Sequence, residues 1–235
     1  MAATEDFSPV LPGDAPSDYE RYLRTEELLA LQKGPGEMAH RDELLFQTVH
    51  QSTELWLKLA TFEVEAAIGH LGARELAAAL RLLRRAHLCL RLLTEQLDML
   101  EQMSPWEYQE IRRVLGHGSG FDSPGWRGLR AAAPKLESEF QALIAEAGLG
   151  VVELYVQGRA HEELYQLAEH MIELDERLTL WRIRHFKVVE RIIGGDVVGT
   201  QGTPVELLEG LVHRKFFPDL WRARTRLTEL AKESD

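Results

Sequence analysis

The sequence predicts an all-α protein built as a bundle of long helices, and three observations carry this prediction. Leucines recur at three- and four-residue steps between residues 76 and 100, which is the spacing of one helical face. No segment alternates apolar and polar residues with the period of two that a half-buried strand shows. Glycine- and proline-rich segments divide the periodic stretches and provide their ends. Together these features are typical of helices packed side by side.

The N-terminal half is predicted to contain an arm and three helical stretches. Residues 1–17 hold three prolines and several acidic residues, so we predict a flexible N-terminal arm. We expect helical structure over residues 19–32 and, after the KGPGE break, over residues 42–71 and 73–103. Residues 18–235 are predicted to form one domain, which is long enough to bury a sizeable core.

The next helix has the clearest start signal. SPWEYQEIRRVL begins with Ser104 as the N-cap, Pro105 at the first helical position and Glu107 three residues after the cap. A loop over residues 116–128 follows and contains five glycines. We therefore expect this helix to end where the glycine-rich loop begins.

Beyond this loop, further helices are predicted at residues 135–146, 151–193, 204–214 and 218–234. The second of these stretches is too long for one ordinary helix, so we expect a break near Gly158. Residues 194–204 form a second loop with four glycines. Glycine loops can bring backbone amides and small hydroxyls close to a ligand, or they can be plain turns.

Composition and charge exclude several classes of function. The net charge of −11 argues against nucleic acid or an anionic membrane as the main partner, because both need clustered basic residues. Cys89 is the single cysteine, which rules out an internal disulfide and a multi-cysteine zinc site, and we expect a reducing cytoplasm. The N-terminus does not resemble a signal peptide, and no apolar run is long enough for a transmembrane helix.

Familiar catalytic motifs are absent, and two histidines stand out instead. The sequence has no phosphate-binding loop, HExxH motif, nucleophile elbow or CxxCH haem attachment motif. His50 shares a helix face with Phe46, Thr53 and Leu57, so an imidazole and an aromatic ring one turn apart could line a pocket. A buried histidine that is hydrogen-bonded to a neighbour is the alternative interpretation.

The second histidine, His185, lies four residues after Trp181 on an apolar helix face that continues with Val188 and Ile192. A neutral imidazole in this setting can ligate haem iron while its other nitrogen is held by an acceptor. A purely structural histidine is the alternative here too. No role is assigned to the other seven histidines, His40, His70, His87, His117, His161, His170 and His213.

Tyr108 and Arg112 form a pair four residues apart on the helix that begins at Ser104. The planar guanidinium fork suits a carboxylate, and the phenol adds a second donor. A surface ion pair of Arg112 is the alternative to a carboxylate site.

Five blocks of sequence lie in a fixed order between residues 19 and 227 and point to one family. They read YERYLRTEELLALQ, RDELLFQTVHQSTELWLKL, SPWEYQEIRRVLGHGSGF, LWRIRHFKVVERIIG and FFPDLWRARTRL. The second block is similar to the signature HDE-x-LF-x3-HQ-x2-ELW, with Arg41 in place of the leading histidine. In all five blocks the chain resembles the tryptophan 2,3-dioxygenase family.

This resemblance implies an all-helical enzyme that encloses a non-covalent b-type haem and uses dioxygen, usually as a homotetramer. It implies His185 as the proximal iron ligand and His50 on the distal side, near the indole N–H of the substrate. The residues that it assigns to the substrate are Phe46 at the indole, Tyr108 and Arg112 at the carboxylate, Leu115 and Ser119 along the wall, Thr200 at the ammonium group, and Tyr19, Tyr22 and Leu23 from a neighbouring subunit.

Three departures from the family pattern affect the expected pocket. The stretch between Arg112 and His185 is shorter than in typical members. The SGFQS-x-Q-[YF]-R segment reads SGFDSPGWR here, so that Trp126 stands where a tyrosine or phenylalanine is usual and is expected beside the haem. The late glycine loop reads GTQGTPV, which leaves Thr203 as the other candidate for the role of Thr200.

The expected function is dioxygenation of the indole 2,3 bond of L-tryptophan or a substituted tryptophan, giving an N-formylkynurenine. One alternative is a haem-dependent aromatic monooxygenase of the same superfamily, which would form an oxindole or a phenol. Another is a haem sensor without turnover, and a helical scaffold without haem is the remaining possibility. The expected partners are an aromatic amino acid and further copies of the chain, as a tetramer or dimer.

Overall fold

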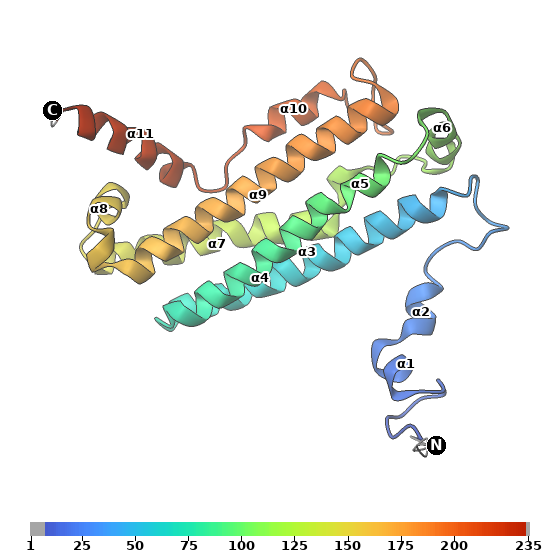
Figure 1. Ribbon diagram of the computed structural model, residues 1–235, viewed down its shortest axis with the longest axis horizontal. Helices are drawn as coiled ribbons and strands as arrows, with labels where there is room; N and C mark the ends of the chain where they lie inside the picture. The colour runs from blue at the N-terminus through green and yellow to red at the C-terminus, as the bar shows by residue number, and fades with distance from the viewer. Residues whose placement is uncertain (1–7, 234–235) are drawn as a thin grey trace, which may run out of the picture.

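The computed structural model describes residues 8–233, and the regular elements over that range are helices (Figure 1). A single isolated bridge between Val198 and Pro204 is the one pairing of extended backbone in the described chain. The predicted all-α fold is therefore confirmed. None of the helices in the described range combines the length and the apolar character that crossing a membrane requires.

Four long helices make the body of the elongated molecule: α3 (Glu43–Gly72), α4 (Leu76–Glu95), α7 (Pro124–Glu146) and α9 (Glu162–Ile193). Helix α3 packs against both α4 and α7, and α4 packs against α9. The large side chains that these helices bury completely include Leu57, Leu71, Leu83, Leu90, Leu136, Phe140 and Leu167. The leucine steps noted in the sequence thus face a shared core, whose burial from water is the main stabilising term.

The C-terminal segment is held to α9 by one buried carboxylate. Asp175 is 0% exposed and accepts hydrogen bonds from the backbone N–H groups of Phe216 and Phe217 and from Nε1 of Trp221, at 2.8–3.0 Å. A buried carboxylate needs such donors to offset the cost of losing water. This anchor sets the start of α11 (Pro218–Glu233), which packs against α8 (Val151–Val156).

Several helix ends agree with the sequence predictions. Helix α6 (Pro105–Val114) starts as expected, because Ser104 accepts a hydrogen bond from the N–H of Glu107. The break near Gly158 is also confirmed, since α8 and α9 are separated by a 3₁₀ turn, η2 (Gly158–Ala160). Helix α10 (Glu206–Val212) lies inside the predicted stretch 204–214.

Two helix predictions were wrong. Helix α7 begins at Pro124, eleven residues before the expected start, because Ser123 caps it and Glu54 of α3 accepts a hydrogen bond from the N–H of Gly125 at 2.9 Å. The predicted stretch 73–103 is interrupted at Gln96, where the N–H of Met99 bonds back only three residues, and a short helix, α5 (Leu97–Leu100), follows.

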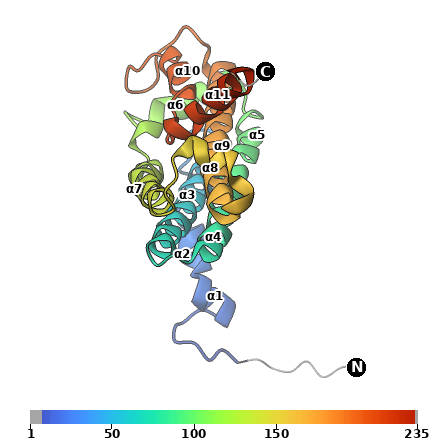
Figure 2. The same ribbon diagram turned by 90° about the vertical axis from the view of Figure 1, so that its left-hand side faces the viewer.

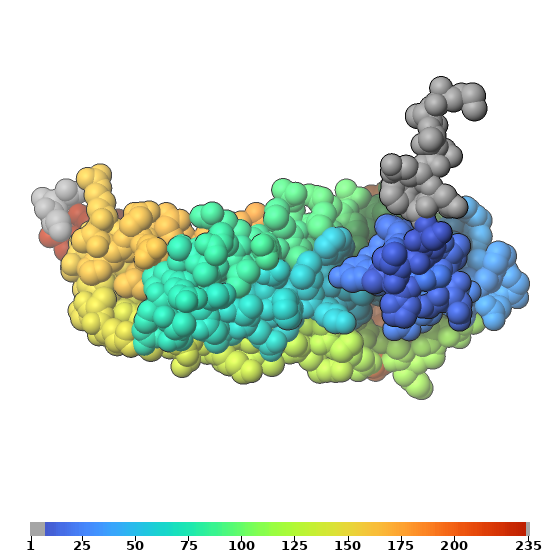
Figure 3. Space-filling view, turned by 90° about the horizontal axis from the view of Figure 1, so that it is seen from below, coloured from blue at the N-terminus to red at the C-terminus, as the bar shows by residue number. Residues whose placement is uncertain are grey.

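The N-terminal helices α1 (Asp18–Leu23) and α2 (Thr25–Leu29) project away from one end of the helical body and bury none of their residues (Figures 1, 2 and 3). Residues 1–7 of the predicted arm lie outside the described residues. The rest of the arm folds back on α1, since the carboxylate of Asp18 accepts hydrogen bonds from the N–H groups of Val10 and Leu11. The flexible arm of residues 1–17 stays a prediction.

Candidate active site

The predicted site residues gather at the end of the bundle where α3, α5, α6 and α9 meet. A small hydrophobic cluster fills this junction and consists of Val49, Leu97, Leu100, Met103, Ile111, Val188 and Ile192. Phe46, Tyr108, Leu115 and Trp181 pack against it. The cluster thus fixes the relative positions of helices whose site residues are up to 139 positions apart in the chain, since the first lies at Phe46 and the last at His185.

His50 is held in one tautomer by its own helix. Its Nδ1 lies 2.7 Å from the carbonyl oxygen of Phe46, so Nδ1–H donates and Nε2 keeps its lone pair. The imidazole ring also lies 4.0 Å from the ring of Phe46, whose other neighbour is the ring of Tyr108 at 6.0 Å. Solvent reaches His50, but the protein surrounds it closely enough that desolvation lowers its pKa below the usual range.

His185 lies flat against the indole of Trp181, with ring centroids 4.7 Å apart and planes at 9°. Trp181 in turn contacts Trp126 of α7, at 4.4 Å between ring centroids. Desolvation, with a smaller contribution from the nearby charge of His50, lowers the pKa of His185 to about 4. His185 is therefore neutral at pH 7, and the two imidazoles lie within electrostatic reach of each other.

Both polar groups of this stack lack protein partners over residues 8–233. Neither ring nitrogen of His185 forms a hydrogen bond, and the buried Nε1 of Trp181 has no acceptor. Buried polar groups are normally paired, so the unpaired Nε1 of Trp181 needs an explanation. A neutral imidazole with a free lone pair is the form that binds a metal ion.

The two glycine-rich loops meet beside this junction. Arg112 donates to the carbonyl oxygen of Val198, and the hydroxyl of Thr200 donates to the carbonyl oxygen of Gly118. Gln201 Nε2 also lies 2.6 Å from a carboxylate oxygen of Asp122. The two loops are therefore joined to each other, and to Arg112, by side-chain hydrogen bonds.

Tyr108 lies one helical turn before Arg112 and contributes a phenol to the same side. Desolvation raises the pKa of Tyr108, and the charge of Arg112 opposes part of this shift. The hydroxyl therefore keeps its proton at neutral pH and can donate it in a hydrogen bond.

Most of the residues singled out in the sequence come together here, and three do not. Those that line or adjoin the junction are Phe46, His50, Tyr108, Arg112, Leu115, Ser119, Trp126, His185 and Thr200. Tyr19, Tyr22 and Leu23 lie on α1, are 68%, 78% and 45% exposed, and do not pack against the cluster of their own chain.

The sequence prediction missed two polar residues that position the site. Glu54 lies one helical turn after His50 and accepts hydrogen bonds from Ser123 and Gly125, which docks the start of α7 on α3. Gln96 bonds to Ser52 and Thr53 of α3. Thr53 and Glu54 follow His50 at helical spacing on α3, but their partners on α7 and at Gln96 are distant in sequence and carry no local signal.

The residues present suit a haem group. His185 offers an unprotonated nitrogen that has no protein partner, and Trp126 and Trp181 provide flat apolar surface beside it. On α3, His50 and Phe46 form a second ring pair, tilted by 32° with centroids 4.0 Å apart. An imidazole ligand within aromatic walls is the donor set that a non-covalent haem uses.

Comparison with known proteins gives one consistent result. Residues 10–138 and 135–227 match the family profile described as tryptophan 2,3-dioxygenase. A protein named tryptophan 2,3-dioxygenase from Bacillus thuringiensis subsp. konkukian (strain 97-27) is 32% identical over 261 residues, covering 89% of this chain and 92% of the relative. One of the same name from Xanthomonas campestris pv. campestris (strain B100) is 33% identical over 258 residues, covering 88% and 86%.

The alignments also locate the shortened stretch. The two matched segments overlap at residues 135–138, and the alignment with the Bacillus relative is longer than the whole of this chain. The relatives therefore carry a segment that this chain lacks, and the junction falls in the middle of α7, directly after Pro134. This agrees with the shorter stretch expected between Arg112 and His185.

Proposed function

The chain belongs to the tryptophan 2,3-dioxygenase family, and from this premise we propose that it adds dioxygen to the indole 2,3 bond of L-tryptophan or a substituted tryptophan. The product is an N-formylkynurenine. The observation that carries the proposal is the placement of a neutral His185 within electrostatic reach of His50, beside Phe46, Tyr108 and Arg112. This set provides an iron ligand, a base and an amino-acid clamp in one place.

The cofactor that this site would hold is haem, and His185 is the residue that would bind its iron. When bound, haem supplies the activation of dioxygen and the transfer of oxygen to the ring. Stacking on Trp181 fixes the plane of the His185 ring, and Trp126 extends the apolar wall. A histidine ring that cannot rotate holds its lone pair in one direction. A cofactor that is bound without covalent attachment depends on a ligand oriented in this way.

The substrate is oriented by groups on α3 and α6. The fork of Arg112 and the hydroxyl of Tyr108 bind the α-carboxylate, and the ring of Phe46 packs against the indole. His50 accepts the indole N–H at Nε2, because its Nδ1–H is already committed to the carbonyl of Phe46. Holding the indole in one orientation lowers the entropic cost of bringing the reacting groups together.

The late loop completes the amino-acid site. Leu115 and Ser119 line the wall, and Thr200 binds the ammonium group. The hydroxyl of Thr200 reaches the carbonyl of Gly118, next to Ser119, which supports Thr200 over Thr203. Thr203 instead uses its backbone carbonyl to accept from Gly199 within the same loop, at 2.8 Å.

The protein acts as a homo-oligomer, a tetramer or a dimer, in which α1 of one subunit covers the site of the next. Tyr19, Tyr22 and Leu23 are exposed on their own chain. Burial of aromatic and leucine side chains is favourable, so such a group of exposed residues is typical of an interface. Their exposure supports a partner surface. Within residues 8–233, α1 and α2 pack mainly on each other, as expected of helices that are exchanged between subunits. A cytoplasmic location and the absence of nucleic-acid partners stay predictions.

One observation favours a second candidate function. Asp122 pairs with Gln201, and Pro124 begins α7 directly beside the altered SGFDSPGWR segment, so the loop walls differ from the family pattern. The alternative is monooxygenation of an aromatic substrate, with an oxindole or a phenol as product. A haem sensor without turnover fits less well, because a sensor has no need of the Tyr108–Arg112 clamp.

The deciding experiment is a product assay with haem-loaded, reduced protein, L-tryptophan and dioxygen. A ring-opened product that has gained two oxygen atoms, seen by mass spectrometry, is the expected result. A main product with one added oxygen would replace the dioxygenase by the monooxygenase. The His185→Ala variant serves as the control and is expected to lose both the Soret band and the product.

A further inference from the structure

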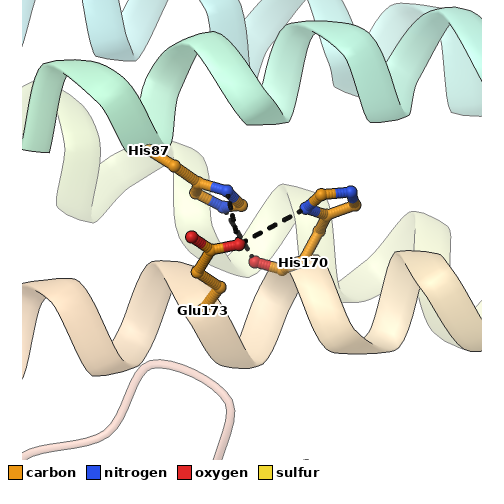
Figure 4. Close-up of side chains that lie close together, drawn as sticks. All are labelled: His87, His170 and Glu173. Atoms are coloured by element: carbon orange, nitrogen blue, oxygen red, sulfur yellow. Dashed lines mark hydrogen bonds and ion pairs between the residues drawn. The ribbon is translucent and has the colours of Figure 1, made fainter.

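A second cluster of metal-binding side chains lies inside the bundle, away from the haem site. His87 of α4 faces His170 and Glu173 of α9, and the three side chains converge on one point (Figure 4). His170 lies fifteen residues before His185, which along a helix is roughly 22 Å. The cluster is therefore independent of the site described above.

The hydrogen bonds of His87 leave one of its contacts unexplained. Its Nε2 lies 3.0 Å from the carbonyl oxygen of His170, and its Nδ1 lies 3.1 Å from Oε2 of Glu173. A neutral imidazole has one donor and one acceptor, so only one of these two oxygens can accept a hydrogen bond from the ring. With a neutral ring, the other contact sets two lone pairs against each other, and either a second proton on the ring or a bound cation would relieve this.

His170 adds an unpaired imidazole at the same point. It is 9% exposed, and neither of its ring nitrogens has a hydrogen-bond partner in the described chain. Its Nδ1 lies 3.8 Å from the same Oε2 of Glu173. Leaving both nitrogens of a buried imidazole without a partner costs free energy, which a bound ligand would recover.

Glu173 is held so that one oxygen remains free for the histidines. Arg177 donates from Nε and Nη2 to Oε1 of Glu173, at 2.8 and 2.5 Å. Oε2 therefore keeps its lone pairs for His87 and His170. Because the side chain of Glu173 is partly exposed, it also provides a route from solvent to the cluster.

We propose that His87, His170 and Glu173 form a binding site for a divalent transition-metal ion of the zinc type. Two ligand atoms that each lie about 2.0–2.1 Å from a tetrahedral ion are about 3.3 Å apart, close to the observed 3.1 and 3.8 Å. The bond from Nε2–H of His87 to a backbone carbonyl is the second contact that metal-bound histidines usually make. Water completes the coordination on the Glu173 side.

Ligand type and charge favour zinc over calcium or magnesium. Two imidazoles and one carboxylate form a ligand set of intermediate hardness, which suits zinc. Calcium and magnesium prefer sites made of oxygen ligands alone. The neighbouring charges are mixed, since Arg84 and Arg177 oppose a cation and Glu169 favours one. The bound ion would cross-link α4 to α9.

The test uses the haem-loaded protein, zinc chloride and a matched set of variants. After incubation with zinc and gel filtration, elemental analysis is expected to find about one zinc per chain. His170→Ala is the main variant, because its side chain makes no hydrogen bond that would be lost. His161→Ala, at the start of the same helix, is the control. We expect zinc retention to fall about tenfold or more in His170→Ala and to persist in the control.

A second readout separates metal binding from folding. Zinc is expected to raise the melting temperature of the parent and of His161→Ala, and to leave that of His170→Ala unchanged. His87→Gln should behave like His170→Ala, since it also removes a ligand. The proposal is overturned if the parent retains no more zinc than His170→Ala, or if zinc leaves its melting temperature unchanged. The His87–Glu173 contact would then be an imidazolium–carboxylate pair.

Discussion

The imidazole of His185 stacks on the indole of Trp181, one helical turn earlier on α9, at 4.7 Å between centroids and 9° between planes. Trp181 packs against both the main core and the small cluster beneath the site. The orientation of the proposed iron ligand is therefore tied to the packing of the bundle.

This stack predicts a graded effect of substitutions at Trp181. Trp181→Leu removes the flat surface, and we expect haem to dissociate at least several times faster, because the His185 ring gains freedom. Trp181→Phe keeps a ring and removes the unpaired Nε1–H, so it should retain haem nearly as well as the parent. Haem transfer to excess apomyoglobin measures both rates. Equal rates of haem loss from the two variants would contradict a role of the stack. Trp106→Leu is the control, because Trp106 is exposed and lies outside the stack.

Arg112→Lys tests the carboxylate clamp. Lysine keeps the charge but cannot form two parallel hydrogen bonds, so apparent tryptophan affinity should fall about tenfold or more while haem content stays near normal. Spectral titration of the haem protein with L-tryptophan measures this. Arg113→Lys is the matched control, because Arg113 is exposed on the same helix. An unchanged titration curve for Arg112→Lys would remove Arg112 from the substrate site.

The haem-free protein is expected to lose stability on acidification. Burial lowers the pKa of His185 to about 4, against about 6.5 in an unfolded chain. Between these values the unfolded chain binds more protons, so the contribution of His185 is fully present above about pH 6.5 and is lost as pH falls towards 4. Urea midpoints measured from pH 4 to 7 would show this slope. His185→Leu should flatten it in part, and an unaltered slope would contradict the assignment.

Gly125 is predicted to be intolerant of a side chain. A Cβ at this position would lie 2.6 Å from Cβ of Leu57 and 2.8 Å from Oε2 of Glu54. We therefore expect Gly125→Ala to destabilise the protein by about 1–3 kcal/mol. Gly69→Ala is the control, since a Cβ there meets nothing within 4 Å and a helical alanine stabilises by about 0.5–1 kcal/mol. Urea denaturation compares the two, and equal midpoints would refute the close contact.

Subunit sharing of the site is testable by mixing inactive variants. If α1 covers a neighbouring site, Tyr22→Ala and Arg112→Ala damage different parts of a shared centre. Hybrids formed by dissociating and reassembling the two variants would then contain some sites with neither change, and activity should rise above that of either variant alone. No gain after mixing would mean that each site belongs to one chain.

Local periodicity was sufficient for the fold class and for placing several candidate site residues on shared helix faces. His50 and Phe46 share a face by helical spacing, and so do His185 and Trp181. The early start of α7 was not predictable in this way, since Glu54, which lies in another helix, turns a glycine-rich segment into a helix start. The contact of Arg112 with the carbonyl of Val198 was also hidden, because a backbone acceptor leaves no mark in the sequence.

The helix side and the loop side of the site are held in place by different interactions. His185 belongs to a 32-residue helix with a buried face, whereas the loops carrying Ser119 and Thr200 are joined by a few side-chain hydrogen bonds. Amide hydrogens of α9 should therefore exchange with solvent only through large-scale opening, while those of the loops should exchange through local fluctuation. Such an arrangement would keep the iron ligand still while amino acids enter and leave through the loop side.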